Sequence, residues 1–338
     1  MPSVLGASPA WENAGSLRTR GWELTIDWRH KFINDLYLYA TASIGDYKTK
    51  VTEWDSNDLI NDYYTGKEYG EIWGFETDRY FDFNDFNGQN ADGSWSYKAG
   101  VADQTKLQSG GFVYGPGDIK FIDQNGDGVI DWGKGTPDDH GDLIKIGNTT
   151  PRYQYSLRLG GSWKGFDLDL YMQGVGKRDY WSQSAFVMPM MRGADALYAN
   201  QTSYVTEAMF HSGVIDQSVD FPRMWGGGAG QGNASGSILN GGRYNFYPQT
   251  KYLVNMSYLR MKNITIGYTI PKNITRKIYL SRVRVYGTIT NAFDIINHNK
   301  GTGIDPEMNN GEGAYGNGVW GRIDPIMRTY SFGIQIDL

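Results

Sequence analysis

Cysteine is absent from all 338 residues, so disulfide bonds, thiolate metal sites and cysteine nucleophiles are excluded. Long apolar runs are also missing. No stretch approaches the roughly 18 apolar residues that a membrane-spanning helix needs, and the mean hydropathy is −0.51, so a helical membrane protein is excluded. The net charge is −5 and no basic face is evident, which argues against nucleic acid as the main partner.

Alternation of apolar and polar residues is the main pattern that is present. The last segment places apolar side chains on one parity and polar or small ones on the other: Tyr330, Phe332, Ile334, Ile336 and Leu338 against Thr329, Ser331, Gly333, Gln335 and Asp337. Successive side chains of a strand point to opposite faces, so a strand between lipid and a polar lumen shows this pattern over about 9–11 residues. The segment predicts a transmembrane barrel strand, although an edge strand of a soluble β-sandwich has the same pattern.

The composition favours the barrel. Glycine occurs 45 times, tyrosine 24 times and tryptophan 11 times. Abundant glycine suits tight turns and long loops, and abundant tyrosine and tryptophan suit the aromatic girdles at the two membrane interfaces.

Seven segments carry the alternation and are predicted as antiparallel strands, at residues 20–30, 36–46, 153–163, 166–174, 258–270, 282–290 and 328–338. In the fifth segment the apolar residues change parity near Lys262 and Asn263, which predicts either a β-bulge or a change from loop packing to lipid exposure. Short links alternate with long predicted loops at residues 47–152, 175–257 and 291–327. Short turns on one side and long loops on the other are the layout of an outer-membrane barrel, with the short side periplasmic. The sequence predicts an all-β fold that forms part of a large transmembrane β-barrel with long extracellular loops.

The odd number of strands predicts that the chain is part of something larger. A single-chain bacterial barrel has an even number of strands, at least eight, and open strand edges in hydrocarbon cost several kcal/mol per unsatisfied backbone group. The residues from Met1 to Pro9 have neither a basic region nor an apolar core of a signal peptide. We therefore expect the chain to be a C-terminal portion, joined covalently or by assembly to upstream strands.

A series of motifs also lies along the chain: Asn13–Leu24 (NAGSLRTRGWEL), Gly66–Asp78 (GKEYGEIWGFETD), Gly117–Asp131 (GDIKFIDQNGDGVID), Ile146–Pro151 (IGNTTP), Gly165–Gly174 (GFDLDLYMQG), Tyr258–Pro271 (YLRMKNITIGYTIP), Asn291–Phe293 (NAF) and Gly303–Glu307 (GIDPE). This ordered set resembles the SusC-like, RagA-like branch of the TonB-dependent outer-membrane transporters of Bacteroidetes. The motifs cover nearly the whole chain in the order of the family.

The resemblance implies a barrel of about 22 strands with an N-terminal plug, which imports a nutrient with energy from the inner-membrane TonB complex. It also implies a SusD-like lipoprotein that caps the barrel from outside and helps to capture a glycan, an oligosaccharide or a peptide. The chain would then lie in the bacterial outer membrane, in contact with lipid, the plug domain and the remaining barrel strands. The sequence departs from the family pattern because it shows no plug, no TonB box and no signal peptide, and because it ends on Leu338 where the family usually has an aromatic residue.

An acidic loop carries the strongest local chemical signal. Oxygen-bearing side chains at alternate positions around a glycine resemble an EF-hand-like calcium loop, and the predicted Ca²⁺ ligands are Asp123, Asn125, Asp127, the carbonyl of Val129, and Asp131. The twelfth position holds Lys134 instead of a bidentate glutamate, so a later carboxylate would have to complete the shell: Asp138, Asp139 or Asp142. The alternative is a metal-free turn closed by hydrogen bonds from the Asp and Asn side chains.

Aromatic clusters in the predicted loops either stack on sugar faces or pack against each other, the commoner use; they contain Trp73, Phe75, Tyr80, Phe81, Trp95, Trp181, Trp225 and Tyr244. The substrate-binding residues are not assigned. No pattern sets a pair of carboxylates at a catalytic separation, so the sequence predicts that the protein is not an enzyme. The alternative function is a calcium-dependent, surface-attached glycan-binding β-domain, whose strands would bury one face in a core.

Overall fold

The largest element of the fold is one antiparallel sheet. The computed structural model describes residues 13, 15–55, 58–109, 112–182, 214–223, 244–299, 302, 304–307 and 326–338. Within them, a seven-stranded sheet has the order β1-β2-β9-β10-β13-β14-β15. Its strands are β1 (Gly15–Lys31), β2 (Tyr37–Trp54), β9 (Arg152–Trp163), β10 (Phe166–Lys177), β13 (Tyr258–Thr269), β14 (Arg282–Asn297) and β15 (Thr329–Asp337). This sheet confirms the predicted all-β fold and its seven antiparallel strands.

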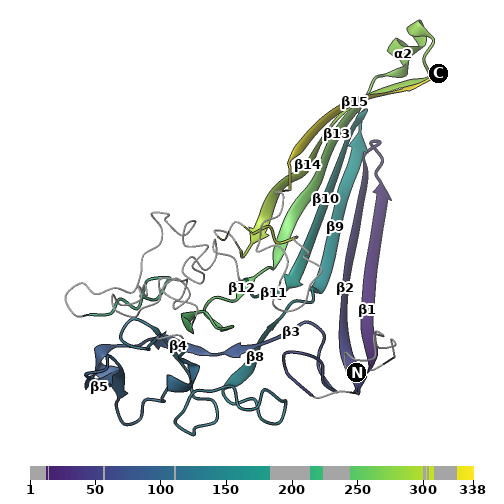
Figure 1. Cartoon of the computed structure of the whole chain (residues 1–338). Helices are drawn as coiled ribbons and strands as arrows, with labels where there is room; N and C mark the ends of the chain where they lie inside the picture. Colours follow the sequence, from purple (N-terminus) through teal and green to yellow (C-terminus); the bar gives the residue numbers. More distant parts are fainter. Residues whose placement is uncertain are drawn as a thin grey trace, which may run out of the picture.

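The connections between these strands fall into two groups. Short links lie at one end of the sheet with the C-terminus, and long connections gather at the other end, beside the N-terminus (Figure 1). The link between β9 and β10 is a two-residue turn in which Lys164 and Gly165 have φ of 49° and 90°. Two consecutive positive φ values give the tight hairpin that matches the twist of the flanking strands. The sheet therefore has a short-turn end and a loop end.

The two faces of the sheet differ in chemistry. One face carries apolar side chains that are exposed in the chain, including Trp22 at 52% and Phe332 at 90% exposure. The opposite face carries polar residues such as Glu23, Ser43 and Gln173, because side chains alternate across each strand. A large exposed apolar surface opposite a polar one is the arrangement of a barrel wall between lipid and a lumen.

The strands extend beyond the range of the alternation toward the loop end. β2 continues to Trp54 and β14 to Asn297, whereas the alternation in the sequence stops near residues 46 and 290. In a membrane barrel the strict alternation is needed only in the part of each strand that meets hydrocarbon, so backbone pairing can continue beyond it without a strict pattern of side chains. The predicted bulge is present, since the pairing of β13 with β14 shifts register between Met261 and Asn263.

Tyrosine side chains on the polar face lie over glycines of neighbouring strands. The ring of Tyr39 covers Gly160, and the ring of Tyr286 covers Gly333, so a β-carbon on either glycine would overlap the ring. The missing side chain makes a slot for the aromatic ring and brings adjacent strands into close contact. These glycines are required by packing and not by backbone conformation.

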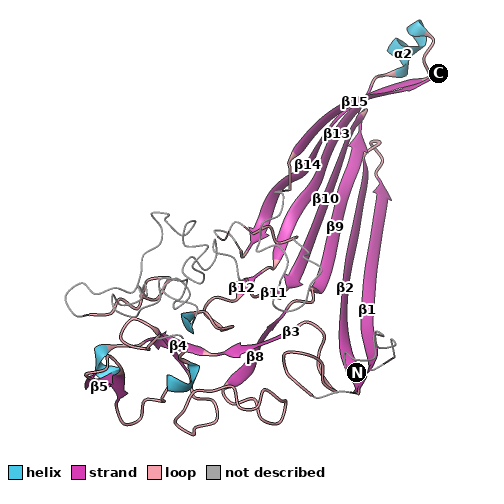
Figure 2. Cartoon of the chain, in the orientation of Figure 1, coloured by secondary structure: helices cyan, strands magenta, loops and turns pink. Residues whose placement is uncertain are grey.

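The long connections form a second folded region. We call the described residues of the β2–β9 and β10–β13 connections the loop lobe (Figure 2). Its strands are β3 (Glu71–Phe75), β4 (Thr77–Tyr80), β5 (Phe86–Gln89), β6 (Trp95–Tyr97), β7 (Ile119–Phe121), β8 (Leu143–Asn148), β11 (Asp179–Tyr180) and β12 (Val254–Asn255), with 3-10 turns η2 (Phe83–Asp85) and η3 (Thr105–Leu107). The strands pair as β3-β8, β4-β7, β5-β6 and β11-β12. The lobe has its own buried core, which includes Phe75, Phe121, Trp181 and Phe246.

The two connections of the loop lobe are joined by a buried polar contact. Arg223, from the second connection, lies with Nη2 at 2.7 Å from the carboxylate of Asp118 in the first. Asn245 donates to the other oxygen of Asp118 at 2.9 Å. Asp118 is fully buried, and removal of one partner from such a pair leaves an uncompensated charge. The lobe is therefore one unit built from two separate stretches of chain.

The sheet is open within the described residues. β1 pairs only with β2, and β15 pairs only with β14, so each edge strand has one unpaired side. The link between β13 and β14 contains the short helix α2 (Lys272–Thr275) and the 3-10 turn η6 (Arg276–Ile278). No helix among the described residues is long and apolar enough to cross a membrane.

Candidate functional site

The polar face of the sheet is cross-linked near the short-turn end. Arg158 on β9 donates to Asp169 on β10 at 2.8 Å, and Tyr39 on β2 donates to the same carboxylate. Arg284 on β14 donates from Nε to Asp167 on β10 at 2.9 Å, across β13. These contacts link different strands of the sheet, and they give each of these charged side chains a partner of opposite charge. This part of the wall therefore offers few free groups to a ligand.

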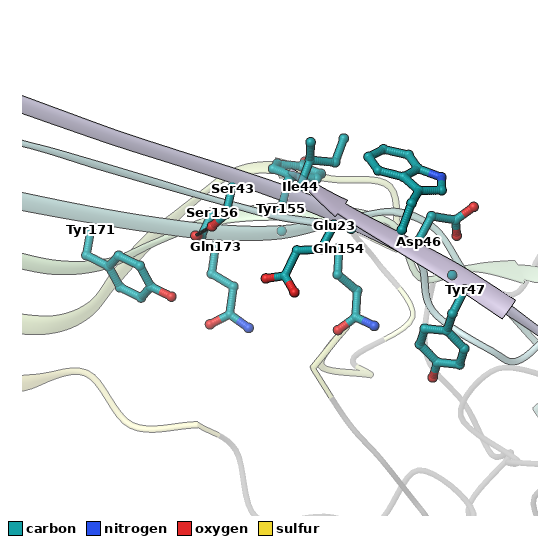
Figure 3. A pocket seen from close by; sticks show the side chains of 14 residues that line it. Glu23, Ser43, Ile44, Asp46, Tyr47, Gln154, Tyr155, Ser156, Tyr171 and Gln173 are labelled. Atoms are coloured by element: carbon teal, nitrogen blue, oxygen red, sulfur yellow. Dashed lines mark hydrogen bonds between the residues drawn. The ribbon is translucent and has the colours of Figure 1, made fainter. Parts of the chain in front are cut away.

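Nearer the loop end, the same face forms an open hollow of about 550 Å³. It is lined from four strands, β1, β2, β9 and β10. The polar side chains that project on one side of these strands (Figure 3) are Glu23, Tyr47, Gln154, Tyr171 and Gln173. On the same face, close to the strand backbones, Ser43 and Ser156 join β2 to β9 through hydroxyls 2.8 Å apart. The hollow is the candidate site for contact with a transported molecule.

The five projecting side chains of this hollow differ from the polar groups of the cross-linked region because they have no partner among the described residues. No hydrogen bond or ion pair to another described residue engages the side chains of the five projecting residues. Amides and phenols donate and accept hydrogen bonds, and the single carboxylate accepts them. The hollow can therefore bind a neutral, hydrogen-bonding ligand such as a peptide backbone or a sugar, or one with a positive group beside Glu23. It has no arrangement for covalent chemistry.

A charge cluster on β13 was not foreseen from the sequence. Arg260 Nε lies 2.5 Å from Asp294 on β14, and Arg260 Nη2 lies 3.0 Å from Asp305. Lys262 Nζ lies 2.8 Å from Glu307. Since Asp305 and Glu307 follow β14, these contacts hold the chain after β14 against the wall of the sheet. The motif GIDPE contained the signal, two carboxylates close in sequence, but nothing local identified their cationic partners.

The acidic loop lies in the loop lobe, and its side chains bond to its own backbone. The carboxylate of Asp123, the amide oxygen of Asn125 and the carboxylate of Asp127 each accept hydrogen bonds from backbone N–H groups two to five residues later. These are the hydrogen bonds of a closed Asx-type turn. The loop is thus shaped by local bonds, whether or not a cation binds.

Asp131, the last predicted ligand, forms an ion pair with Lys106 at 2.5 Å, and this contact holds the pKa of Asp131 below its usual value. Asp142 is fully buried and accepts a hydrogen bond from the backbone of Asp131 at 2.8 Å. Burial and the negative charge of Asp123 raise the pKa of Asp142. In the described part of the chain, no group of three or more His, Asp or Glu side chains converges as a metal site. The calcium site, including the Val129 carbonyl, stays a prediction.

The aromatic residues considered for ligand stacking are mostly part of the lobe core. Phe75, Phe81 and Trp181 have no exposed surface, and Trp95 packs against the same cluster. The buried set also contains Trp73, Tyr80 and Tyr244. These side chains pack against each other and are not available to a ligand. Trp225 lies outside the described residues.

Glu71 is another buried charge in the lobe, with 3% of its side chain exposed. Trp73 Nε1 donates to it at 2.8 Å and Lys145 Nζ lies 3.0 Å away, while the hydroxyl of Tyr64 donates to the same oxygen as Trp73. Burial disfavours the ionised form, but these three partners outweigh it and hold the pKa of Glu71 below its usual value. Glu71 is a structural carboxylate that ties β3 to β8.

Comparisons with known proteins agree with the family resemblance. No protein-family model matches the chain. The chain is 23% identical over 343 residues to TonB-dependent receptor P26 of Formosa agariphila, a match that covers 99% of this chain and 30% of the relative. It is 22% identical over 356 residues to TonB-dependent receptor P3 of the same organism, covering 99% of this chain and 30% of the relative. The chain thus spans about a third of the length of the curated relatives it matches.

Solved structures show the same fold. The RagAB peptide transporter matches with a TM-score of 0.60 at 18% identity, over 99% of this chain and 31% of that chain. The RagAB peptide importer in the open-open state matches with a TM-score of 0.57 at 18% identity, over 100% of this chain and 30% of that chain. The sheet therefore has the fold of a section of such a barrel. The relatives are described as receptors and importers and not as enzymes, which agrees with the prediction of a non-enzymatic protein.

Proposed function

We propose that this chain is a section of the barrel wall of a TonB-dependent importer in the bacterial outer membrane. The observation that carries the proposal is the sheet itself: an exposed apolar face lies opposite a polar one, and the described parts of the long connections lie at one end. The similarity to TonB-dependent receptors over 99% of the chain supports it. The loop end then lies outside the cell, and the short-turn end faces the periplasm.

The unpaired edges of β1 and β15 are the places where the remaining barrel strands would attach. A plug domain would occupy the lumen and receive energy from the TonB complex. We propose a SusD-like lipoprotein as the outer partner, because the similar solved structures are of the two-component RagAB importer. The transported nutrient would be a peptide or an oligosaccharide, since the free amides and phenols of the hollow suit either.

Cysteine labelling tests which face meets lipid, and the chain is well suited to it because it contains no cysteine. We would place single cysteines in the intact protein in outer membranes, as Glu23→Cys, Leu24→Cys, Gln173→Cys and Met172→Cys. A charged, membrane-impermeant maleimide should label the first and third, which face the lumen, and spare the second and fourth. Equal labelling of neighbouring positions would contradict the barrel placement.

Uptake tests the transport itself. Deletion of the complete gene should abolish growth on the transported peptide or oligosaccharide, and complementation with the intact gene should restore energy-dependent uptake. The alternative, a surface glycan-binding domain, predicts release from the envelope without detergent. Release by salt or chelator alone would favour that alternative and overturn the importer.

A further inference from the structure

Four basic side chains form a patch on the outer face of β1 and β2. Arg18 lies opposite Lys50, and Arg20 lies opposite Lys48. All four share the parity of Trp22 and are therefore on the apolar, outward side of the sheet. They are exposed, and directly opposed residues of an antiparallel pair have β-carbons about 4.5–5.5 Å apart. We call these four residues the basic patch.

The basic patch is only partly neutralised by the protein. Lys48 Nζ lies 3.4 Å from Glu68. For Arg18, Arg20 and Lys50, no ion pair with any described residue exists. Like charges directly opposite each other on a sheet repel and destabilise the pairing, and these three cations have no ion-pair partner among the described residues to offset that repulsion.

The acidic residues nearest in sequence are already engaged. Asp46, next along β2 on the same face, pairs with Arg152 at 2.5 Å. Glu68 is shared between the patch and Arg152, which lies 3.6 Å away. Glu53 accepts a hydrogen bond from Ser16 at 3.0 Å and forms no ion pair with a residue of the patch. The counter-charge for the basic patch therefore has to come from outside the described chain.

The position of the basic patch points to the lipid headgroups as a source of counter-charge. On β1 the outward apolar band runs from Trp28 to Trp22, with an indole at each end, as in the aromatic girdles of membrane barrels. With a rise of about 3.3 Å per residue, Arg20 lies about 7 Å and Arg18 about 13 Å beyond Trp22 along the strand, toward the loop end. This is the depth of the lipid headgroups, just outside the hydrocarbon core.

We propose that the basic patch binds the phosphate groups of a phosphorylated lipid in the outer leaflet, an inference that rests on the proposed placement of the sheet in the outer membrane. Guanidinium groups bind phosphate oxygens in pairs, and lysine ammonium groups add point charges. The acyl chains of the same lipid would lie along the apolar band below Trp22. Recognition thus has two parts: the basic patch binds the phosphate groups, and the apolar band contacts the acyl chains. Free inorganic phosphate can make only the first of these contacts.

The test uses the intact transporter, reconstituted in phosphatidylcholine vesicles that contain either diphosphorylated lipid A or the same lipid with its phosphates removed. After extraction in mild detergent, native mass spectrometry measures the lipid that stays bound. The wild-type protein should retain phosphorylated lipid at least about tenfold over the dephosphorylated form. The variant Arg18→Gln/Arg20→Gln/Lys48→Gln/Lys50→Gln should lose this preference.

A matched control removes cations on the other side of the membrane. The variant Lys272→Gln/Arg276→Gln/Lys277→Gln changes exposed residues of the short-turn end and should retain lipid like the wild type. Both variants should keep heat-modifiable mobility and substrate uptake, because none of these side chains lines the hollow. Equal lipid retention by the patch variant, or full displacement of the lipid by millimolar inorganic phosphate, would overturn the proposal. Extraction without detergent would contradict the proposed membrane placement itself, and this result is obtained before any lipid is measured.

Discussion

The sheet and the loop lobe use the same residue types in opposite ways. In the sheet, Trp22 and Phe332 are 52% and 90% exposed, on the face proposed to meet lipid. In the lobe, Trp181 and Phe75 have no exposed surface and pack in a core. The difference shows that aromatic content does not decide a role in this chain. The arrangement decides it: alternation along a strand presents rings to a membrane, and clustering across loops buries them.

The largest effect is expected from expression of residues 1–338 alone. The sheet has unpaired edges at β1 and β15, and unsatisfied backbone groups in hydrocarbon cost several kcal/mol each. We expect aggregation or degradation and no heat-modifiable band on gels, while the intact protein gives one. A stable, closed pore from these residues alone would refute the view that the sheet needs further strands.

A matched pair of substitutions compares the two regions directly. Phe75→Ala in the lobe core should cost about 3–5 kcal/mol, because it leaves a cavity. Phe332→Ala on the sheet should cost less, since lipid chains fill the space and only the transfer term is lost. Hydrogen exchange of the intact protein in nanodiscs would report both local stabilities. Equal losses at the two sites would show that Phe332 is packed and not lipid-exposed.

Charge insertion tests the apolar face from the other direction. Ile26→Arg, in the middle of the band on β1, should destabilise the barrel by about 2–4 kcal/mol, as for arginine near the bilayer midplane. Thr25→Arg on the opposite face should cost less, because it meets a polar lumen. Folding titrations in urea and lipid vesicles would measure both. A larger cost for Thr25→Arg would reverse the assignment of the faces.

Acid should weaken the lobe before the sheet. The pKa of Glu71 is lowered in the folded state by its hydrogen bonds from Tyr64, Trp73 and Lys145, which outweigh burial. Its contribution is therefore complete above the ordinary glutamate pKa of about 4.5 and is lost as pH falls through the lower folded value. We expect Glu71→Gln to cost about 1–3 kcal/mol at pH 7 and to flatten the pH dependence of limited proteolysis between about pH 5 and 3. If Glu71→Gln leaves the pH dependence of limited proteolysis unchanged, groups other than Glu71 are responsible for it.

The smallest effect is expected from calcium. If Asp123, Asn125, Asp127 and Asp131 bind one cation, Lys106 must release Asp131, so affinity should be modest. Millimolar calcium should then stabilise the lobe by about 1 kcal/mol, measured by calorimetry with magnesium as the comparison ion. Asp127→Asn should abolish the shift, and Asp92→Asn, in an exposed turn of the same lobe, should not. No shift in the wild type would leave the loop as a metal-free turn.

The sequence predicted what strand geometry enforces locally. Phe332 and Trp22 were placed outward because side chains alternate, and the bulge near Lys262 was visible as a change of parity. The strand extension to Trp54 was not predicted, because outside the apolar band no pattern is required. The lobe core was not predicted either: Phe75 and Phe246 belong to one buried cluster that is built from separate connections, which no local pattern encodes.

The hollow was not predicted from the sequence; only the face on which its side chains lie was. Alternation placed Glu23 and Gln173 on the polar face, but it did not give their neighbours. Which side chains become neighbours depends on register, which is set by the pairing of β1 with β2, β2 with β9 and β9 with β10. A shift of one residue in any pair would move a side chain to the other face. Only the assembled sheet shows that these side chains have no hydrogen-bond partner among the described residues.

The ion pair between Asp118 and Arg223, which joins the two connections of the loop lobe, imposes an order on biogenesis. In the proposed placement, the lobe lies outside the cell, whereas its two connections start from the periplasm. Each connection must cross the bilayer as an unfolded chain, because a folded core would not pass between paired strands. Since Asp118 and Arg223 come from different connections, the lobe is completed only after both have crossed. The apolar residues of its core therefore stay exposed during export, and periplasmic chaperones would have to shield them until the hairpins are inserted.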